Sequence, residues 1–220
     1  MAKTHGKNRL ECLGDAHGDA TVVTDRADPA TSALVSALRV RSAGLAEHSQ
    51  RVADLAIGLG TRLGFAGRQL KHLRAAALLH DIGRMSLPDT VLTGAGPLSR
   101  SDWELIRQHP QAAFDLLGTG FPAEVAEVVR SHHEHLDGSG YPDGLAGDDI
   151  PELARLVLVC DAFDAMTSER PYRAPLARSE ALIELEASAG TIFDPDMVRE
   201  FARMVKREGD VVSFPIARAG

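Results

Sequence analysis

The 220-residue sequence predicts an all-α fold, a compact bundle of several helices. Alanine and leucine recur at steps of three and four residues, the spacing that places side chains on one face of a helix. The alternation of apolar and polar residues that marks a half-buried strand is almost absent. Glycine and proline fall between the periodic segments, where they end helices or form turns.

The first two helices are placed by periodicity and by a proline. Residues 30–40 follow Pro29, and proline is favoured in the first turn of a helix. Residues 45–59 form the second helix, in which His48 lies on the apolar face. Glycine weakens a helix, so we expect this one to fray at its end, which Gly58, Gly60 and Gly64 mark.

The third helix covers residues 70–79 and stops by Gly83. A loop is expected over residues 85–96, because turn signals rich in glycine and proline interrupt the periodicity there. Ser99 and Ser101 each offer an N-cap to the helix that follows.

Pro110 kinks or restarts that fourth helix after His109, because proline cannot donate a main-chain hydrogen bond inside a helix. Residues 122–133 form the next helix, and a glycine-rich loop follows over residues 138–147. The last three helices are expected at residues 153–168, 178–188 and 195–206.

Composition favours one globular domain, with 44% apolar and 25% charged residues. We expect a tail over residues 1–29, a folded domain over 30–207 and a second tail over 208–220. A net charge of −7 argues against binding to a nucleic acid polymer. The sequence has two cysteines, no stretch of about 20 apolar residues and no signal peptide, so we expect a cytoplasmic protein without membrane contact.

Histidines and aspartates at helix ends and on apolar helix faces predict a metal site. One such histidine is more often a satisfied core residue than a ligand, but this many buried titratable groups would be costly without a metal. Imidazole with carboxylate suits iron, manganese, zinc, nickel or cobalt better than magnesium or calcium. The candidate ligands are His48, His80, Asp81, His109, His132, His133 and Asp161.

Three motifs together resemble the HD-GYP subfamily of the HD phosphohydrolases. They are the adjacent pair His80 and Asp81, the run HHEHLDGSGYP at residues 132–142, and the run DAFDAMTSERPYR at residues 161–173. The resemblance implies an HD-domain-like bundle whose glycine-rich loop covers a buried metal site. It also implies a bacterial phosphodiesterase that hydrolyses cyclic di-GMP to pGpG or GMP.

The resemblance places the seven candidate ligands on the family's metal positions, with Asp81 bridging two metals. Asp81 and Arg84 are then the expected catalytic residues, and two divalent transition metal ions are the expected cofactors, most simply iron or manganese. The residues suited to substrate binding are Arg84, Gly140, Tyr141, Arg170 and Arg173. The planar guanidinium of arginine can form paired hydrogen bonds with phosphate or guanine. Glycine allows the backbone to approach a ligand closely.

Two positions depart from the family pattern. Relatives that bind a third metal carry a glutamate where this chain has Gly44, so we expect two metals. The family lysine that contacts the scissile phosphate is replaced by Arg84, which keeps the charge but presents a planar fork.

Two alternatives remain open at this stage. One is an HD phosphohydrolase for another cyclic dinucleotide or nucleotide. The other is a catalytically weak signalling module that binds a nucleotide or a partner protein. We also expect signalling protein partners and a homodimer, in which apolar N-terminal helices pair.

Overall fold

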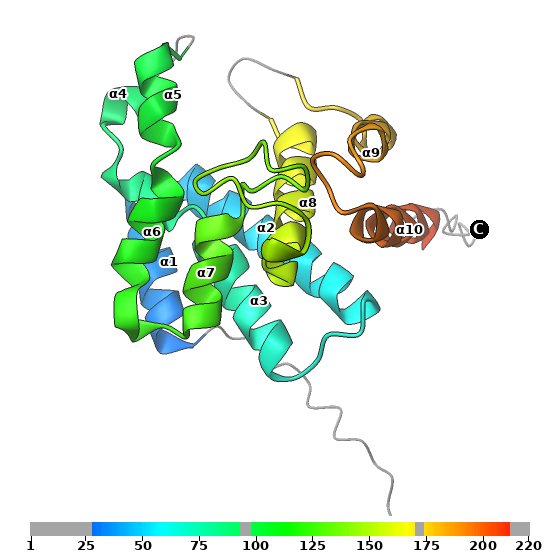
Figure 1. The fold of residues 1–220 in the computed structure, drawn as a ribbon, viewed down its shortest axis with the longest axis horizontal. Coiled ribbons are helices and arrows are strands. Elements are labelled where there is room, and N and C mark those ends of the chain that lie inside the picture. The colour runs from blue at the N-terminus through cyan, green and yellow to red at the C-terminus, as the bar shows by residue number, and fades with distance from the viewer. Residues whose placement is uncertain (1–27, 93–97, 170–173, 212–220) are drawn as a thin grey trace, which may run out of the picture.

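The computed structural model describes residues 28–92, 98–169 and 174–211, the last four by their backbone alone (Figure 1). The α-helices are α1 (Pro29–Arg41), α2 (Ala43–Arg62), α3 (Arg68–Leu79), α4 (Asp89–Leu92), α5 (Arg100–Ile106), α6 (His109–Leu117), α7 (Ala123–Ser131), α8 (Glu152–Thr167), α9 (Arg178–Ala187) and α10 (Pro195–Val211). Short 3-10 helices are η1 (Ile82–Ser86), η2 (Gly118–Gly120) and η3 (Gly147–Asp149). Within these ranges two isolated bridges occur and no strand, so the all-α prediction is confirmed.

One local expectation was confirmed and one was wrong. Helix α2 ends at Arg62, within the stretch from Gly58 to Gly64 where its end was expected, and Gly60 is buried where α2 crosses α3. A Cβ atom at Gly60 would lie 2.7 Å from Leu73 Cδ2, so the missing side chain lets the two helices approach. The segment expected as a loop from residue 85 contains the end of η1 and all of α4.

Side-chain caps account for several helix starts. The Asp28 carboxylate accepts hydrogen bonds from the amides of Ala30 and Thr31, both at 3.0 Å, at the start of α1. Ser99 caps α5, and the Asp102 carboxylate accepts from the Ser99 amide in return. Such caps satisfy main-chain amides that the first turn of a helix leaves without partners.

Helices α2 and α8 lie at the centre of the bundle, as Figure 1 shows. On one side of them are α1, α3, α6 and α7, and on the other are α9 and α10. Small buried residues such as Ala53, Ala56 and Ala76 let α2 and α3 pack closely. On the opposite side, the rings of Phe163 and Phe201 meet edge to face, with centroids 4.9 Å apart.

The expected tails, residues 1–29 and 208–220, fall almost entirely outside the described residues. The division into a domain at 30–207 and two tails therefore stays a prediction. Helix α1 begins at Pro29, and α10 extends to Val211. None of the described helices has the length and apolar character needed to cross a bilayer.

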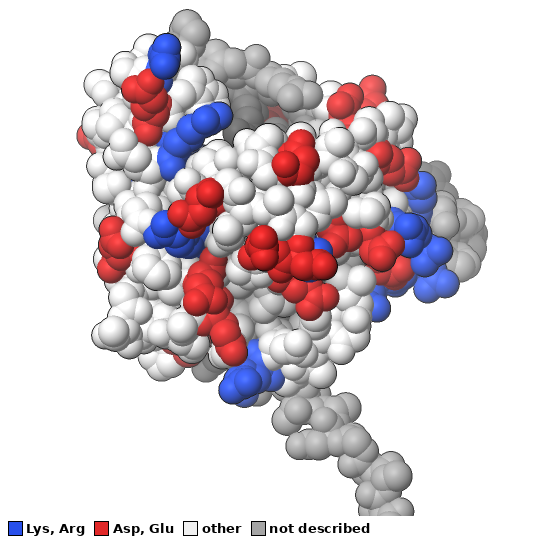
Figure 2. All heavy atoms as spheres, viewed as in Figure 1, with Lys and Arg blue, Asp and Glu red and all other residues white. Residues whose placement is uncertain are grey.

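Acidic side chains gather across the middle of the face shown in Figure 2, while lysine and arginine side chains are scattered around them. The described part of this face therefore carries no continuous basic surface of the kind that follows a nucleic acid backbone.

Replacing Gly83 with alanine tests how η1 is seated on α6. A Cβ atom there would lie 2.7 Å from the Ala113 amide nitrogen and still closer to the His109 carbonyl oxygen. Because backbone cannot yield as a flexible side chain does, we expect Gly83→Ala to lower the free energy of unfolding by about 1–3 kcal/mol in urea titrations. Gly120→Ala, which places a Cβ in open space, is the control and should change stability by less than about 0.5 kcal/mol. Equal stability of the two variants would contradict this account of Gly83.

Candidate metal centre

Three of the predicted ligand histidines stand at helix ends, and each is oriented by the helix that precedes it. His80 follows α3, His132 follows α7, and His109 begins α6, three residues after the last residue of α5. The last carbonyls of a helix have no amide partner within the helix, so a side chain can bond to them. The bonds join His80 Nδ1 to Ala77 O (2.8 Å), His109 Nδ1 to Ile106 O (2.7 Å) and His132 Nδ1 to Val129 O (2.6 Å).

These bonds determine which nitrogen of each ring faces the centre. A carbonyl oxygen can only accept, so Nδ1 carries the proton and Nε2 of a neutral ring keeps its lone pair. The Nε2 atoms of His109 and His132 lie 3.3 Å apart. Two lone pairs at that distance repel each other unless a cation lies beside both.

His48 and Asp161 reach the centre from the middle of helices. His48 is part of α2 and Asp161 is part of α8, and these helices pack together. His48 Nε2 lies 3.0 Å from Asp161 Oδ1. His80 Nε2 lies 3.9 Å from the same oxygen.

The seven predicted ligands form two neighbouring groups. In each, the donor atoms lie within 4.8 Å of one another. One group is Asp81, His109, His132 and His133, and the other is His48, His80 and Asp161.

Asp81 faces both groups, one oxygen to each. Its Oδ1 atom lies 3.2 Å from His109 Nε2, within its own group. Its Oδ2 atom lies 3.6 Å from His80 Nε2 and 3.9 Å from His48 Nε2, in the other group. The carboxylate is therefore placed to be shared between two metal ions.

Buried donor atoms without hydrogen-bond partners indicate that the residues fit a metal pair. Among the described residues, the Nε2 atoms of His80 and His133 and both oxygens of Asp81 have no such partner. Leaving these groups buried and unsatisfied would be costly, whereas coordination to a cation satisfies each of them. The donor set of imidazoles and carboxylates suits divalent transition metals.

At His80, His132, His133 and Asp81 the pKa shifts favour the protonation states that metal binding requires. Burial is the largest cause of the low pKa of His133, about 3, and it lowers the pKa values of His80 and His132 as well. These rings are neutral at pH 7, so their lone pairs are available. Burial raises the pKa of Asp81, but Arg84, His80 and His109 outweigh it and hold that carboxyl ionised.

His48 differs from the other histidines because two carboxylates hold it. Burial lowers its pKa, but hydrogen bonds to Asp161 and Asp164 outweigh burial and raise it to about 9. The partner on Nδ1 is Asp164, whose Oδ2 atom lies 2.6 Å away. Asp164 is not among the predicted ligands. Its place three residues after Asp161, on the same face of α8, is the signal that could have found it.

Arg84 lies in η1 beside the centre, with Nε 2.7 Å from Asp81 Oδ1. The contact is an ion pair without hydrogen-bond geometry, so the guanidinium retains donors for another group. A cavity of about 490 Å³ opens here, and Arg84, His48, His133 and Asp161 are among its lining residues. Gly44 also lines this cavity. Glycine has no side chain, so this position supplies no further carboxylate, although a Cβ atom there would lie in open space.

The glycine-rich loop is held by the side chain of Glu134. The buried Glu134 carboxylate accepts from the amides of Asp143, Gly144 and Leu145, at 2.7, 3.1 and 3.0 Å. A Cβ atom at Gly140 would overlap the backbone of residues 133–135, so the close approach at this glycine is to the chain itself.

Tyr141 stacks on the His133 ring, with centroids 4.8 Å apart and an interplanar angle of 27°. The tyrosine ring therefore packs against the ring of a predicted ligand. Substrate contacts at Gly140 and Tyr141 stay predictions. The other two expected contacts, Arg170 and Arg173, lie outside the described residues.

The chain belongs to the HD domain family, which matches residues 33–197. The first curated relative is a cyclic di-GMP phosphodiesterase response regulator, RpfG, from Xanthomonas campestris, which is 36% identical over 82% of this chain and 49% of its own length. A 3'3'-cGAMP-specific phosphodiesterase 3 from Vibrio cholerae is 34% identical over 85% of this chain and 37% of its own length. The chain thus spans half or less of the length of these relatives.

A solved structure confirms the fold. Bd1817, an HDG"Y"P protein from Bdellovibrio bacteriovorus, superposes with a TM-score of 0.63 at 23% identity, over 80% of this chain and 60% of its own. The resemblance drawn from the sequence motifs is therefore confirmed at the level of family and fold.

Replacing Asp81 with asparagine tests its position between the two ligand groups. The amide keeps the shape but removes the negative charge that two cations would share. We expect the affinity for Mn(II) to fall at both sites by more than about 100-fold, beyond the roughly 10- to 100-fold cost of losing an outer partner. Competition with a chelator and metal analysis after desalting measure this. Asp115→Asn, on the exposed face of α6, is the control. Two tightly bound equivalents in Asp81→Asn would show that Asp81 is not shared.

Proposed function

We propose that this chain is a metal-dependent phosphodiesterase that hydrolyses cyclic di-GMP to pGpG, GMP or both, in bacterial second-messenger signalling. One observation carries the proposal: Asp81 stands between two groups of buried metal-ligating side chains beside an open cavity. The names of the relatives support it, since those at 33–38% identity include several cyclic di-GMP phosphodiesterases.

Two divalent transition metal ions are the proposed cofactors, one for each ligand group. Iron or manganese fits the mixed donor set best, and zinc, nickel or cobalt fits the same chemistry. When bound, such a pair supplies an activated water and Lewis acidity toward a phosphodiester. The proposed ligands remain His48, His80, Asp81, His109, His132, His133 and Asp161.

Arg84 is the residue proposed to bind the scissile phosphate. It reaches the rim of the cavity while its guanidinium stays anchored near Asp81. Asp81 raises the pKa of Arg84, although burial opposes this, so the cation persists at every working pH. A fixed positive charge here stabilises the negative charge that grows on the phosphoryl oxygens during hydrolysis.

The rest of the substrate is proposed to meet Gly140, Tyr141, Arg170 and Arg173. Arginine forks can bind the second phosphate or a guanine edge through paired hydrogen bonds. Tyr141 already contacts His133, so any base stacked on it would lie close to the ligand cluster.

A second candidate substrate is favoured by a specific comparison. The Vibrio cholerae relative is named as specific for 3'3'-cGAMP and is 34% identical, close to the identity of the cyclic di-GMP enzymes. These dinucleotides share the cyclic phosphodiester ring that the centre would hydrolyse and differ in one base. A catalytically weak binding module is the remaining alternative, because Arg84 replaces the lysine expected for the family.

The proposal includes a cytoplasmic location, signalling protein partners and a homodimer, and it excludes nucleic acid polymers and membranes as partners. The two-cysteine composition and the net charge of −7 support the location and the exclusion of polymers.

The first test supplies anaerobically purified protein with Fe(II) or Mn(II) and with cyclic di-GMP, 3'3'-cGAMP or cyclic di-AMP. We expect metal-dependent conversion of cyclic di-GMP, with pGpG and GMP resolved by chromatography, and none by Asp81→Ala. Faster turnover of 3'3'-cGAMP would move the assignment to that substrate. No product from any of the three dinucleotides, with metal shown to be bound, would refute the proposal and leave another nucleotide substrate or the binding module.

Replacing Arg84 separates charge from shape at the proposed phosphate contact. Arg84→Met removes the cation, and we expect kcat to fall by about 100- to 1,000-fold, the usual cost of one lost electrostatic contact to the transition state. Arg84→Lys restores the charge and should recover most of that loss. Measuring kcat and bound metal together checks this, since unchanged kcat in Arg84→Met would remove Arg84 from the reaction.

A further inference from the structure

His48 cannot be oriented in the way that His80, His109 and His132 are. Those rings stand at helix ends and bond to carbonyls that the helix leaves free. His48 lies within α2, where each carbonyl already accepts from the amide four residues on. A ligand in the middle of a helix therefore needs a partner from another element.

Asp164 of α8 is that partner. Its Oδ2 atom lies 2.6 Å from His48 Nδ1, on the side of the ring away from the other ligands. An ionised carboxylate only accepts, so it holds the proton on Nδ1 and leaves Nε2 to face Asp161, 3.0 Å away. The Asp164 side chain is nearly buried, with 5% of its surface exposed, which limits the directions that it can take.

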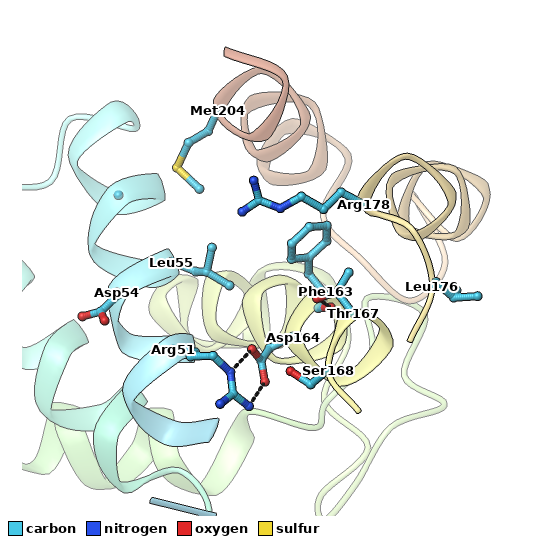
Figure 3. A pocket seen from close by; sticks show the side chains of 11 residues that line it. Arg51, Asp54, Leu55, Phe163, Asp164, Thr167, Ser168, Leu176, Arg178 and Met204 are labelled. Atoms are coloured by element: carbon cyan, nitrogen blue, oxygen red, sulfur yellow. Dashed lines mark hydrogen bonds and ion pairs between the residues drawn. The ribbon is translucent and has the colours of Figure 1, made fainter. Parts of the chain in front are cut away.

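Arg51 holds Asp164 in turn, as Figure 3 shows. The guanidinium donates from Nε to Oδ1 at 2.7 Å and from Nη2 to Oδ2 at 3.0 Å. Both oxygens of Asp164 are thus engaged, by Arg51 and by His48. This distinguishes Asp164 from Asp161, whose donor atom belongs to a predicted ligand group.

The Arg51–Asp164 pair also separates two cavities. One is the cavity of about 490 Å³ at the metal centre, and the other, of about 500 Å³, lies toward Leu55 and Met204. Arg51, Asp164 and Ser168 line both of them. Because His48 and Arg51 engage both oxygens of Asp164, this carboxylate is not a free donor for a metal or a substrate.

We propose that Asp164, braced by Arg51, is a positioning residue that orients His48 toward one of the two metals. Carboxylates that accept from the second nitrogen of a ligand histidine fix the ring and make it a stronger donor. The alternative is a structural role, in which the pair only ties α2 to α8.

The selective effect on one metal separates positioning from a structural role. Asp164→Asn should weaken the binding of one Mn(II) equivalent by about 10- to 100-fold and leave the second equivalent unchanged. Arg51→Gln, which leaves the carboxylate in place but releases it, should weaken the same equivalent by less. Titration of Mn(II) against a competing chelator, with electron paramagnetic resonance as the readout, resolves the two equivalents.

Asp54→Asn is the matched control, because Asp54 lines the second cavity from α2 without contacting His48. It should bind both equivalents as the parent protein does. The decisive comparison is made in a His48→Ala background, where Asp164→Asn should cause no further loss of metal affinity.

Three results would overturn the proposal. They are equal loss of both equivalents in Asp164→Asn, unchanged metal affinity together with a lower Tm, and a further loss in the His48→Ala background. If Asp164→Asn does not fold, the half-exposed Arg51 supplies the same comparison through Arg51→Gln. Asp164 has this role only if the protein binds metal as proposed above, but the titration uses no substrate. A protein that binds two metals and turns over no dinucleotide would therefore refute the function and leave this test intact.

Discussion

The candidate centre depends on hydrogen bonds that hold histidine rings by their Nδ1 atoms. Three rings use carbonyls at the ends of α3, α5 and α7, groups that every helix leaves without an amide partner. Each bond points Nε2 in one direction and settles the tautomer, so the donors are in place before any metal arrives. Carbonyls at helix ends that would otherwise need water or a capping side chain therefore hold the ligand histidines in place.

Close helix packing brings these ends together. Alanines and Gly60 allow α2 and α3 to approach, and α2 and α8 form the centre from which His48 and Asp161 project. Gly83 plays the same part beside the ligands, because η1 rests directly on the backbone at His109. A shift of one helix by a fraction of a turn would separate donors that now lie within 4.8 Å of each other.

Charged side chains around the centre offset the charge of the carboxylates inside it. Asp81 is a buried anion and Asp161 a partly buried one, and the neutral histidines with lowered pKa values add no positive charge to offset them, whereas His48, with its raised pKa, does. Arg84 offsets part of this charge on one side, and Arg51 neutralises Asp164 on the other. Arg84 also leaves one positive group facing the cavity where a phosphate would bind.

The sequence by itself determined the all-α class, most helix positions and the identity of the seven candidate ligands, because periodicity and motif spacing are local properties of the chain. The tertiary structure decided how those ligands divide into two groups and that Asp81 faces both. It also placed Asp164, held by Arg51, against His48, and showed that Gly140 makes room for the chain's own backbone. The contacts of Asp164 with His48 and Arg51 join segments more than 100 residues apart, and only the packing of α2 against α8 creates them.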